Sequence, residues 1–531
     1  MESAAAVEND GEAEEHLMAA LALAEQQGPE GPHLGEALHD FGSFLFWRDR
    51  LDEAAAHLQR AVSVREAAFG SEHAGVAPSL NNLAEVYWAQ NRQSEALPLL
   101  ERALAITEAS DQPDENELAR SLNNLALLYH AQGKYAEAEP LYKRSLAIWE
   151  KSLGPEHPEV ATGLNNLAEA YRAQGRYDEA EPLYQRSLAI KERALGPEHL
   201  DVATDLTDLA LLYDAQGKYA EAEPLVKRVA AIREKALGPE HPDVAESLNG
   251  LATIYEARGK YAEAEPLFKR ALAIQEKALG PDHERTGMAL NNLAHLYRTL
   301  GRYSEAEPLF QRSLAIGEKV LGPEHPEVAR TLNNLAELYR LKGEYTNAEL
   351  YIGRSLAIRE TVLGQDHPDV AMGLNALGLL YSDKGEYAEA EPVLKRSVEI
   401  EEKALGPDHP ELAVSLQNLA NVYYAMGEHA DAEPLYNQSL AILEKAHGPE
   451  HTRIATVLSN LAELYRVQGR YEEAEPLYER ALVIQEKVFG LEHSDLVSLV
   501  EIYADLLRNL GRTAKADRLE AQAKAIRAKQ E

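Results

Sequence analysis

The sequence contains no cysteine and comparatively few basic residues. The absence of cysteine excludes disulfide frameworks, cysteine-ligated zinc or iron–sulfur centres, and cysteine nucleophiles. The 53 Lys and Arg residues stand against 88 Asp and Glu residues, which gives a net charge of -35. We therefore expect no nucleic-acid partner, because nucleic-acid binding needs a basic footprint. No run approaches the ~18 apolar residues of a transmembrane helix, so we also expect no membrane insertion.

The first 30 residues contain no Lys or Arg. Their short apolar stretch, residues 17–24, follows Glu12, Glu14 and Glu15, whereas a secretory signal has a basic segment at this place. We interpret the stretch as a helix of a cytoplasmic protein. The absence of cysteine is consistent with a reducing compartment.

A repeat of 42 residues runs through the chain. The segment LNNLA at 122–126 recurs at 164–168, and steps of 42 from Leu38 to Val500 define twelve units without an insertion or deletion. After Leu164, apolar residues follow at i+3, i+4 and i+7, which predicts one face of a helix. Gly175 interrupts this helix, and Gly196-Pro197 ends the second one. Neither helix could bury its apolar face alone, so the units are expected to stack into a continuous core.

The order of Leu, Ala, Tyr and Gly within each unit resembles the tetratricopeptide repeat (TPR), whose usual period is about 34 residues. The longer period, with a Gly-Pro-Glu-His-Pro loop at 154–158, is similar to the TPR units of kinesin light chains and nephrocystin-3-like proteins. The resemblance implies an all-α fold, a right-handed TPR superhelix (α-solenoid) of about twelve 42-residue helix-turn-helix units. We expect an acidic tail and capping helix at 1–34, the array at 35–510 and a C-terminal capping helix at 511–531.

An acidic residue followed by His occupies most loops between units. The pairs are Glu72-His73, Glu156-His157, Glu198-His199, Glu240-His241, Asp282-His283, Glu324-His325, Asp366-His367, Asp408-His409, Glu450-His451 and Glu492-His493. A metal site needs several ligands within about 2.2 Å of one ion, whereas successive helix layers lie about 10 Å apart. We therefore expect each pair to finish the turn and cap the next helix. Phosphate-loop, zinc-protease and nucleophile-elbow motifs are also missing, which predicts no enzyme, no cofactor and no metal.

The resemblance implies that the first helices line a concave groove in which protein or peptide partners bind. The position two residues after the first Leu of each unit is the candidate contact. Seven units have asparagine there: Asn82, Asn124, Asn166, Asn292, Asn334, Asn418 and Asn460. Asn is an unfavourable helix-interior residue, whereas its carboxamide can hold both the C=O and N–H of an extended peptide. The alternative is a structural bond to the backbone of a neighbouring repeat, a role that the asparagines one position earlier could also have. The row of Asn is interrupted at Asp208, Gly250 and Ala376.

Arginines on the same helices are candidate anchors for an acidic peptide: Arg120, Arg172, Arg298, Arg330 and Arg340. Each is also explained by pairing with a nearby Glu at the surface. The first unit differs in its aromatic density, with Phe41, Phe44, Phe46 and Trp47. We expect these rings to pack under the N-terminal capping helix, the alternative being an exposed partner site.

The leading hypothesis is a non-enzymatic interaction scaffold or adaptor that binds extended peptide segments in the groove. A second hypothesis, a motor cargo adaptor like a kinesin light chain, would be marked by heptads before the repeats, and none occur in this sequence. A third is a regulatory sensor whose superhelix responds to a bound peptide. The partner's identity and the oligomeric state stay open.

Overall fold

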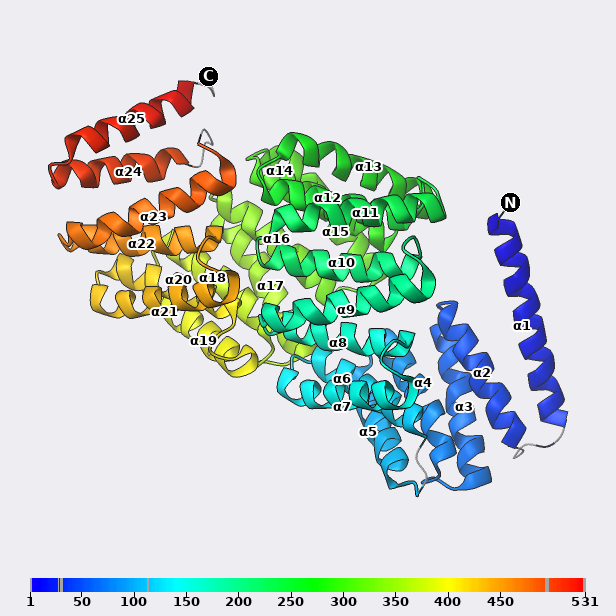
Figure 1. Cartoon of the computed structure of the whole chain (residues 1–531). Helices are drawn as coiled ribbons and strands as arrows, with labels where there is room; N and C mark the ends of the chain where they lie inside the picture. Colours follow the sequence, from blue (N-terminus) through cyan, green and yellow to red (C-terminus); the bar gives the residue numbers. More distant parts are fainter. Residues whose placement is uncertain (1, 27, 29–31, 112–113, 492–495, 529–531) are drawn as a thin grey trace. The chain divides into compact units, whose positions relative to one another are not determined.

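The computed structural model describes residues 2–26, 28, 32–111, 114–491 and 496–528. These residues form 25 α-helices and one short 3-10 helix, without a strand among them (Figure 1). The repeated helix-turn-helix arrangement confirms the predicted all-α solenoid. None of the described helices combines the length and hydropathy needed to cross a membrane. The chain divides into two compact units, Met1–Ala170 and Tyr171–Glu531, here called unit 1 and unit 2.

The helices of unit 1 are arranged mostly in pairs that succeed one another along the chain. They are α1 (Glu2–Gln26), α2 (Pro32–Trp47), α3 (Leu51–Phe69), the 3-10 helix η1 (Ala74–Val76), α4 (Ala77–Ala89), α5 (Gln93–Ala109), α6 (Glu115–Ala131), α7 (Tyr135–Leu153) and most of α8 (Pro158–Ala173).

Unit 2 continues the same alternation. Its helices are α9 (Tyr177–Leu195), α10 (Leu200–Ala215), α11 (Tyr219–Leu237), α12 (Pro242–Ala257), α13 (Tyr261–Leu279), α14 (Glu284–Thr299), α15 (Tyr303–Val320), α16 (Pro326–Leu341), α17 (Tyr345–Leu363), α18 (Pro368–Lys384), α19 (Tyr387–Leu405), α20 (Pro410–Met426), α21 (His429–His447), α22 (Thr452–Val467), α23 (Tyr471–Phe489), α24 (Leu496–Asn509) and α25 (Thr513–Ala528).

The two helices of a unit pack against each other at small residues. In α14 and α15, Ala294 and Ala306 are fully buried in one core cluster with Phe310. Because alanine is small, the two backbones approach closely and the larger ring fills the space beside them. Gly343, at a φ of 75°, ends the turn after α16 in a backbone conformation that favours glycine. The period of the sequence thus sets both the crossing and the turn.

The first and last helices, α1 and α25, each bury one side and leave the other polar. Leu21 and Ala24 of α1 are buried in the core cluster of the first repeats, and Glu25 of α1 lies 2.7 Å from Arg60. At the other end, α25 buries only its small and apolar side, which includes Ala516 and Ile526. Polar outer faces of this kind close a repeat array against solvent.

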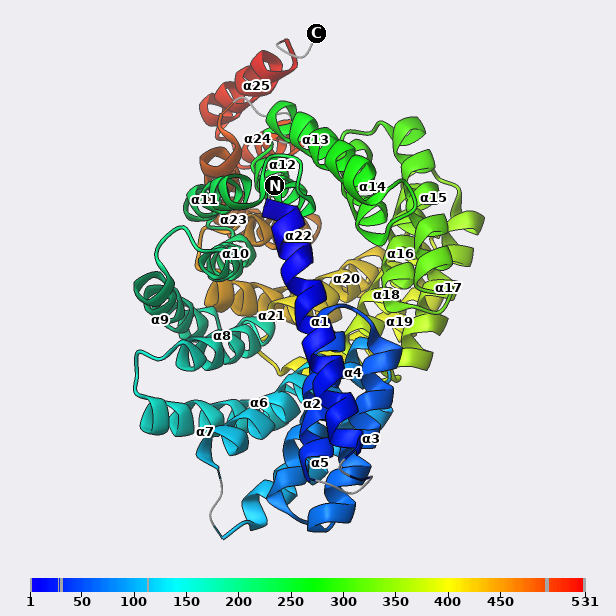
Figure 2. The same ribbon diagram turned by 90° about the vertical axis from the view of Figure 1, so that its right-hand side faces the viewer.

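Unit 2 also brings together repeats that lie far apart in the sequence. The Nε2 atom of His409, at the start of α20, donates to the carbonyl oxygen of Ala173, at the end of α8, at 2.8 Å. One unit further along, a Cβ atom on Gly217 would come within 2.5 Å of the His451 ring. In Figure 2, α10 and α11 accordingly lie close to α22 and α23. Unit 2 therefore makes contacts between successive turns of its own solenoid.

Candidate functional site

The loop histidines cap helices, as predicted. In each of the nine described acid–His pairs, Nδ1 of the histidine accepts a hydrogen bond of 3.0–3.2 Å from the backbone N–H two residues later. His493 lies outside the described residues. Among the residues that are described, no three His, Asp or Glu side chains are placed to hold one metal ion. The loop pattern is thus explained by helix geometry.

The acidic member of the pair has a different role from the predicted one. Glu240 lies 2.7 Å from Lys277, and Asp282 lies 2.6 Å from Lys319, at the end of the second helix one unit later. The capping prediction was therefore wrong for these acids. The reason is that the histidine already accepts the free N–H of the helix start, so the acid is left to pair with the lysine of the next unit.

The asparagines at the candidate position, here called the rung asparagines, bond the preceding repeat through Nδ2. In unit 1, Asn82 donates to Ser43 Oγ at 2.7 Å, Asn124 to Glu85 Oε1 at 2.6 Å, and Asn166 to Asn123 Oδ1 at 2.9 Å. In unit 2, Asn334 donates to Asn291 at 3.0 Å, Asn418 to Asn375 at 3.3 Å, and Asn460 to Asn421 at 3.1 Å. A carboxamide has two donors and an acceptor, so a bracing bond of this kind leaves each rung able to bind a ligand as well.

Asn292 is the exception. The residue 43 positions earlier, which supplies the acceptor for Asn334 and Asn418, is here Asn249, and its buried Oδ1 accepts no hydrogen bond in the described part of the chain. Both residues line a cavity of about 280 Å³ on this face of unit 2. Where the rung is Ala376, the buried Oδ1 of Asn333 likewise accepts no bond from the described residues. At Ala376 the interruption of the row thus leaves a buried acceptor behind it, whereas at Asn249 the acceptor is left although the rung asparagine is present.

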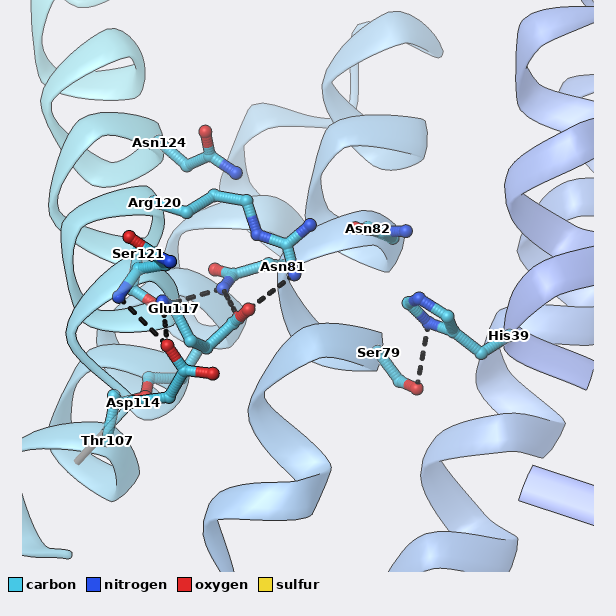
Figure 3. Close-up of polar contacts among 12 residues, drawn as sticks. His39, Ser79, Asn81, Asn82, Thr107, Asp114, Glu117, Arg120, Ser121 and Asn124 are labelled. Atoms are coloured by element: carbon cyan, nitrogen blue, oxygen red, sulfur yellow. Dashed lines mark hydrogen bonds and ion pairs between the residues drawn. The ribbon is translucent and has the colours of Figure 1, made fainter. Parts of the chain in front are cut away.

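The asparagines one position before the rungs lie deeper between the helices. Asn81 donates to Glu117 Oε1 and to Ser121 Oγ, both at 2.8 Å (Figure 3). Asn375 donates to Ser397 Oγ at 3.0 Å and accepts from Asn418. These contacts are with side chains of other helices, whereas the sequence suggested the backbone as partner. They join successive repeats.

Most of the candidate arginines are held by neighbouring carboxylates. Arg120 lies 2.5 Å from Glu117, and Arg330 lies 2.8 Å from Glu327. Arg340 binds both oxygens of Glu337, at 2.7 and 2.9 Å, and also pairs with Asp383. A ligand carboxylate would have to compete with these partners.

The two remaining arginines lie near the ends of their helices. Arg298 is half-buried in α14 and makes no side-chain hydrogen bond or ion pair within the described residues; its burial lowers its pKa, opposed by the charges of Glu337 and Glu256. Arg172, in the last turn of α8, acts on Asp214 through its charge and lowers the pKa of that carboxyl, while burial raises it more. Arg298 thus differs from the carboxylate-held arginines.

The same face of unit 1 carries a cavity of about 310 Å³. Its walls are largely apolar and include Phe46, Trp88 and Leu127, and its polar groups are Glu85 and Asn124. Burial raises the pKa of Glu85, and the bond from Asn124 opposes this shift. The cavity thus combines an aromatic wall with one buried carboxyl group.

The aromatic residues of the first unit divide between two environments. Phe41 is buried in one core cluster with Leu21 of α1, which fits the predicted packing under the capping helix. Trp47 is 81% exposed, so that prediction was wrong for this residue. The reason is that Trp47 is the last residue of α2. Among the described aromatic residues it contacts only Phe46, in an edge-on arrangement with a centroid distance of 5.6 Å.

Comparison with known proteins agrees with the repeat architecture. Two family models, both described as tetratricopeptide repeat, match the chain, one at residues 33–109, 117–193, 159–235, 215–277, 243–319, 285–361, 327–402, 369–445 and 453–529 and the other at 418–487. The chain belongs to the tetratricopeptide repeat family. None of the curated proteins matches the sequence of this TPR chain. Neither matched family describes an enzyme.

Three solved structures are similar to parts of this TPR protein. The first is BtubC (BKLC) from P. vanneervenii, at 24% identity over 43% of this chain and 92% of that one, with a TM-score of 0.38. The second consists of nearly identical TPR-like repeats assigned to a kinesin light chain of Podosopora anserina, at 36% identity over 39% of this chain and 98% of that one. The third is a single-substitution variant of these repeats, at 35% identity over 38% of this chain and 95% of that one. Both have a TM-score of 0.35.

Sequence reasoning missed two residues of the TPR face. Trp88 and Asp214 occupy the register that Arg172 and Arg298 occupy in their repeats, and each lines a cavity. The signal that would have found them is the change of chemistry at one register, from a cation to an aromatic ring in unit 1 and to a carboxylate in unit 2.

Proposed function

We propose that this TPR protein is a non-enzymatic scaffold that binds extended peptide segments of partner proteins along the face formed by its first helices. Membership of the TPR family supports the role as a protein-interaction scaffold. One observation supports the site: each unit has a cavity on this face that adjoins a rung asparagine, Asn124 in unit 1 and Asn292 in unit 2.

The rung asparagines and the cavities would bind different parts of a peptide. A carboxamide can accept from a backbone N–H and donate to a backbone C=O, independent of the peptide's side chains. Packed helices lie about 10 Å apart, which is the length of about three extended residues at ~3.3 Å each. The cavities, of about 310 and 280 Å³, are of the size that takes a side chain between the rungs.

Selection from a random peptide library displayed against the full chain tests this proposal. Each selected peptide is then remade with single N-methyl groups, which remove one backbone N–H at a time. We expect the affinity to fall about tenfold at positions three residues apart, because a lost hydrogen bond costs about 0.5–1.5 kcal/mol and its unsatisfied partner more. Failure to select any peptide, or binding that tolerates N-methylation everywhere, would refute the proposal.

Asn292→Ala links the effect to a rung. The side chain of Asn292 makes no hydrogen bond within the described residues, so its removal breaks no brace, unlike removal of the Asn334 side chain. The variant should lose the sensitivity to N-methylation at one peptide position and keep it at the others. Asn347→Ala is the matched control, because Asn347 is an exposed residue of the second helix α17 and should change nothing.

A further inference from the structure

The cavity of unit 2 lies where the row of rung asparagines is interrupted by Gly250. It is lined by α10, α11, α12 and Asn292 of α14, and its volume is about 280 Å³. A Cβ atom on Gly250 would meet only Val226 Cγ1 within 4 Å, at 3.5 Å, which is an ordinary contact. A larger residue therefore fits here sterically, and the glycine leaves open a space that an asparagine side chain would occupy.

The walls of this cavity are largely apolar, and its polar groups include an acidic one, Asp214. Val226 and Ile254 supply apolar surface, with Leu211 at the rim. Asp214 adds a carboxylate that makes no side-chain hydrogen bond within the described residues, and Asn249 adds a buried Oδ1 that accepts none there. A long apolar stem that ends in hydrogen-bond donors would satisfy both kinds of surface.

The charge at this place also favours a cation. Burial raises the pKa of Asp214 more than the charge of Arg172 lowers it, so this cavity-lining carboxylate is incompletely compensated and would gain from a further positive partner. Arg233, which also lines the cavity, already has partners. It donates to the carbonyl of Asp243 and to Ser247 Oγ, both at 3.1 Å, and lies 3.7 Å from Glu246. Asp214 stands in the register of Arg172 and Arg298, so the sign of the charge is reversed at this point of the face.

We propose that this cavity, defined by Asp214, Val226, Asn249, Gly250 and Ile254, binds a lysine or arginine side chain of the extended peptide. The methylene groups of the side chain lie against the apolar wall, and its N–H donors bond the Asp214 carboxylate. This inference rests on the proposed function, since the side chain belongs to a peptide bound along the same face.

Peptide pools with one fixed position test the inference by fluorescence polarisation on the full chain. Each pool is randomised elsewhere, and its central residue is Lys, Arg, norleucine or Glu. We expect the Lys and Arg pools to bind at least tenfold more tightly than the norleucine pool, because a hydrogen bond to a charged group contributes about 1.5–3 kcal/mol. The Glu pool should bind most weakly.

Two variants connect this preference to the cavity. Asp214→Asn keeps the shape and removes the charge, and it should reduce the preference for the basic pools about tenfold. Gly250→Asn fills the space and should abolish the preference while other binding persists. Ala376→Asn is the matched control, because it introduces the same residue at the same register outside the cavity and should leave the preference unchanged.

The outcomes separate the two proposals. If no pool binds the native chain, the proposed function fails and this inference with it. If pools bind without a preference for Lys or Arg, or if the preference survives both Asp214→Asn and Gly250→Asn, only the basic side-chain site is overturned. A preference for the Glu pool would overturn it as well.

Discussion

Replacing Ala376 by Asn should stabilise the contact between α16 and α18. The buried Oδ1 of Asn333 accepts no hydrogen bond within the described residues, and residue 376 stands 43 positions after it. The same spacing separates Asn334 from Asn291, where Nδ2 donates to Oδ1 at 3.0 Å. Ala376 is only half-buried, so there is room for a carboxamide in the same orientation.

The size of the effect follows from two opposing contributions. An unsatisfied buried acceptor costs about 1–3 kcal/mol, and the new bond removes that cost. Asparagine is less favourable than alanine inside a helix by up to about 0.7 kcal/mol. The net gain is therefore about 0.5–2 kcal/mol, confined to the helices that carry residues 333 and 376.

Hydrogen exchange read by mass spectrometry is the suitable assay, because a long repeat array does not unfold in one two-state step. Amides of α16 and α18 that exchange through local opening should slow by about two- to thirtyfold, since each 1.4 kcal/mol is a factor of ten. Amides of α24, far along the chain, provide an internal reference.

Two further variants decide whether the hydrogen bond is the cause. Ala376→Asp has nearly the same shape but places an acceptor against an acceptor, so exchange should become faster. In the Asn333→Ala background, Ala376→Asn has no acceptor to bond, and its stabilising effect should disappear. Unchanged or faster exchange in the Ala376→Asn single variant would refute the reasoning.

Three other predictions concern buried ionisable groups of unit 2. Lys191→Met should destabilise the unit by about 3–5 kcal/mol, because it leaves the fully buried carboxylate of Asp205 without its charge partner. In the native chain this carboxylate lies 2.5 Å from Lys191 Nζ. Thermal unfolding tests this, with Lys191→Met/Asp205→Asn as the rescue variant. Burial raises the pKa of Glu401 from 4.5 to about 7, so the folded state binds more protons than the unfolded state between these pH values. The free energy of unfolding therefore falls as the pH rises from 4.5 through 7. Glu401→Gln should unfold at a higher temperature than the native chain at pH 8 but not at pH 4. Burial lowers the pKa of His447 from 6.5 to about 3, so the unfolded state binds more protons and the free energy of unfolding falls as the pH drops below 6.5. His447→Leu should therefore lose less of its unfolding temperature between pH 7.5 and 5 than the native chain does. An equal loss in both proteins would contradict this prediction.

The helices could be predicted because each depends on residues close in sequence. In most units the tyrosine after the Gly-x turn marks the start of the second helix, as at Tyr303, and apolar residues at helical spacing mark its buried side. A period of 42 residues repeats these local signals in register, so an error in one unit is corrected by its neighbours. This redundancy is why the solenoid followed from the sequence.

The partners of the rung asparagines could not be predicted in the same way. Asn124 and Asn166 have the same local sequence, yet one donates to Glu85 and the other to Asn123. The difference depends on which side chain of the preceding helix reaches the carboxamide first. Glu85 competes with Asn81 for the Nδ2 of Asn124 and leaves Asn81 Oδ1 buried without a bond from the described residues. A repeat pattern fixes the register, but such competition is decided by distances between helices.

Contacts between distant turns of unit 2 are harder still to predict, because their geometry accumulates from a small rotation at every repeat. The residues that make them also carry local signals. Gly217 has a φ of 69°, which already calls for glycine at a helix end, and His451 caps α22 like its counterparts. The one local departure is His447, which stands where Leu405 stands one repeat earlier and stacks on His451 at a centroid distance of 4.3 Å and on Tyr177 at 5.6 Å. A polar ring at an apolar register is therefore the sequence signal for this contact, and it becomes interpretable only when the other turn of the solenoid is in place beside it.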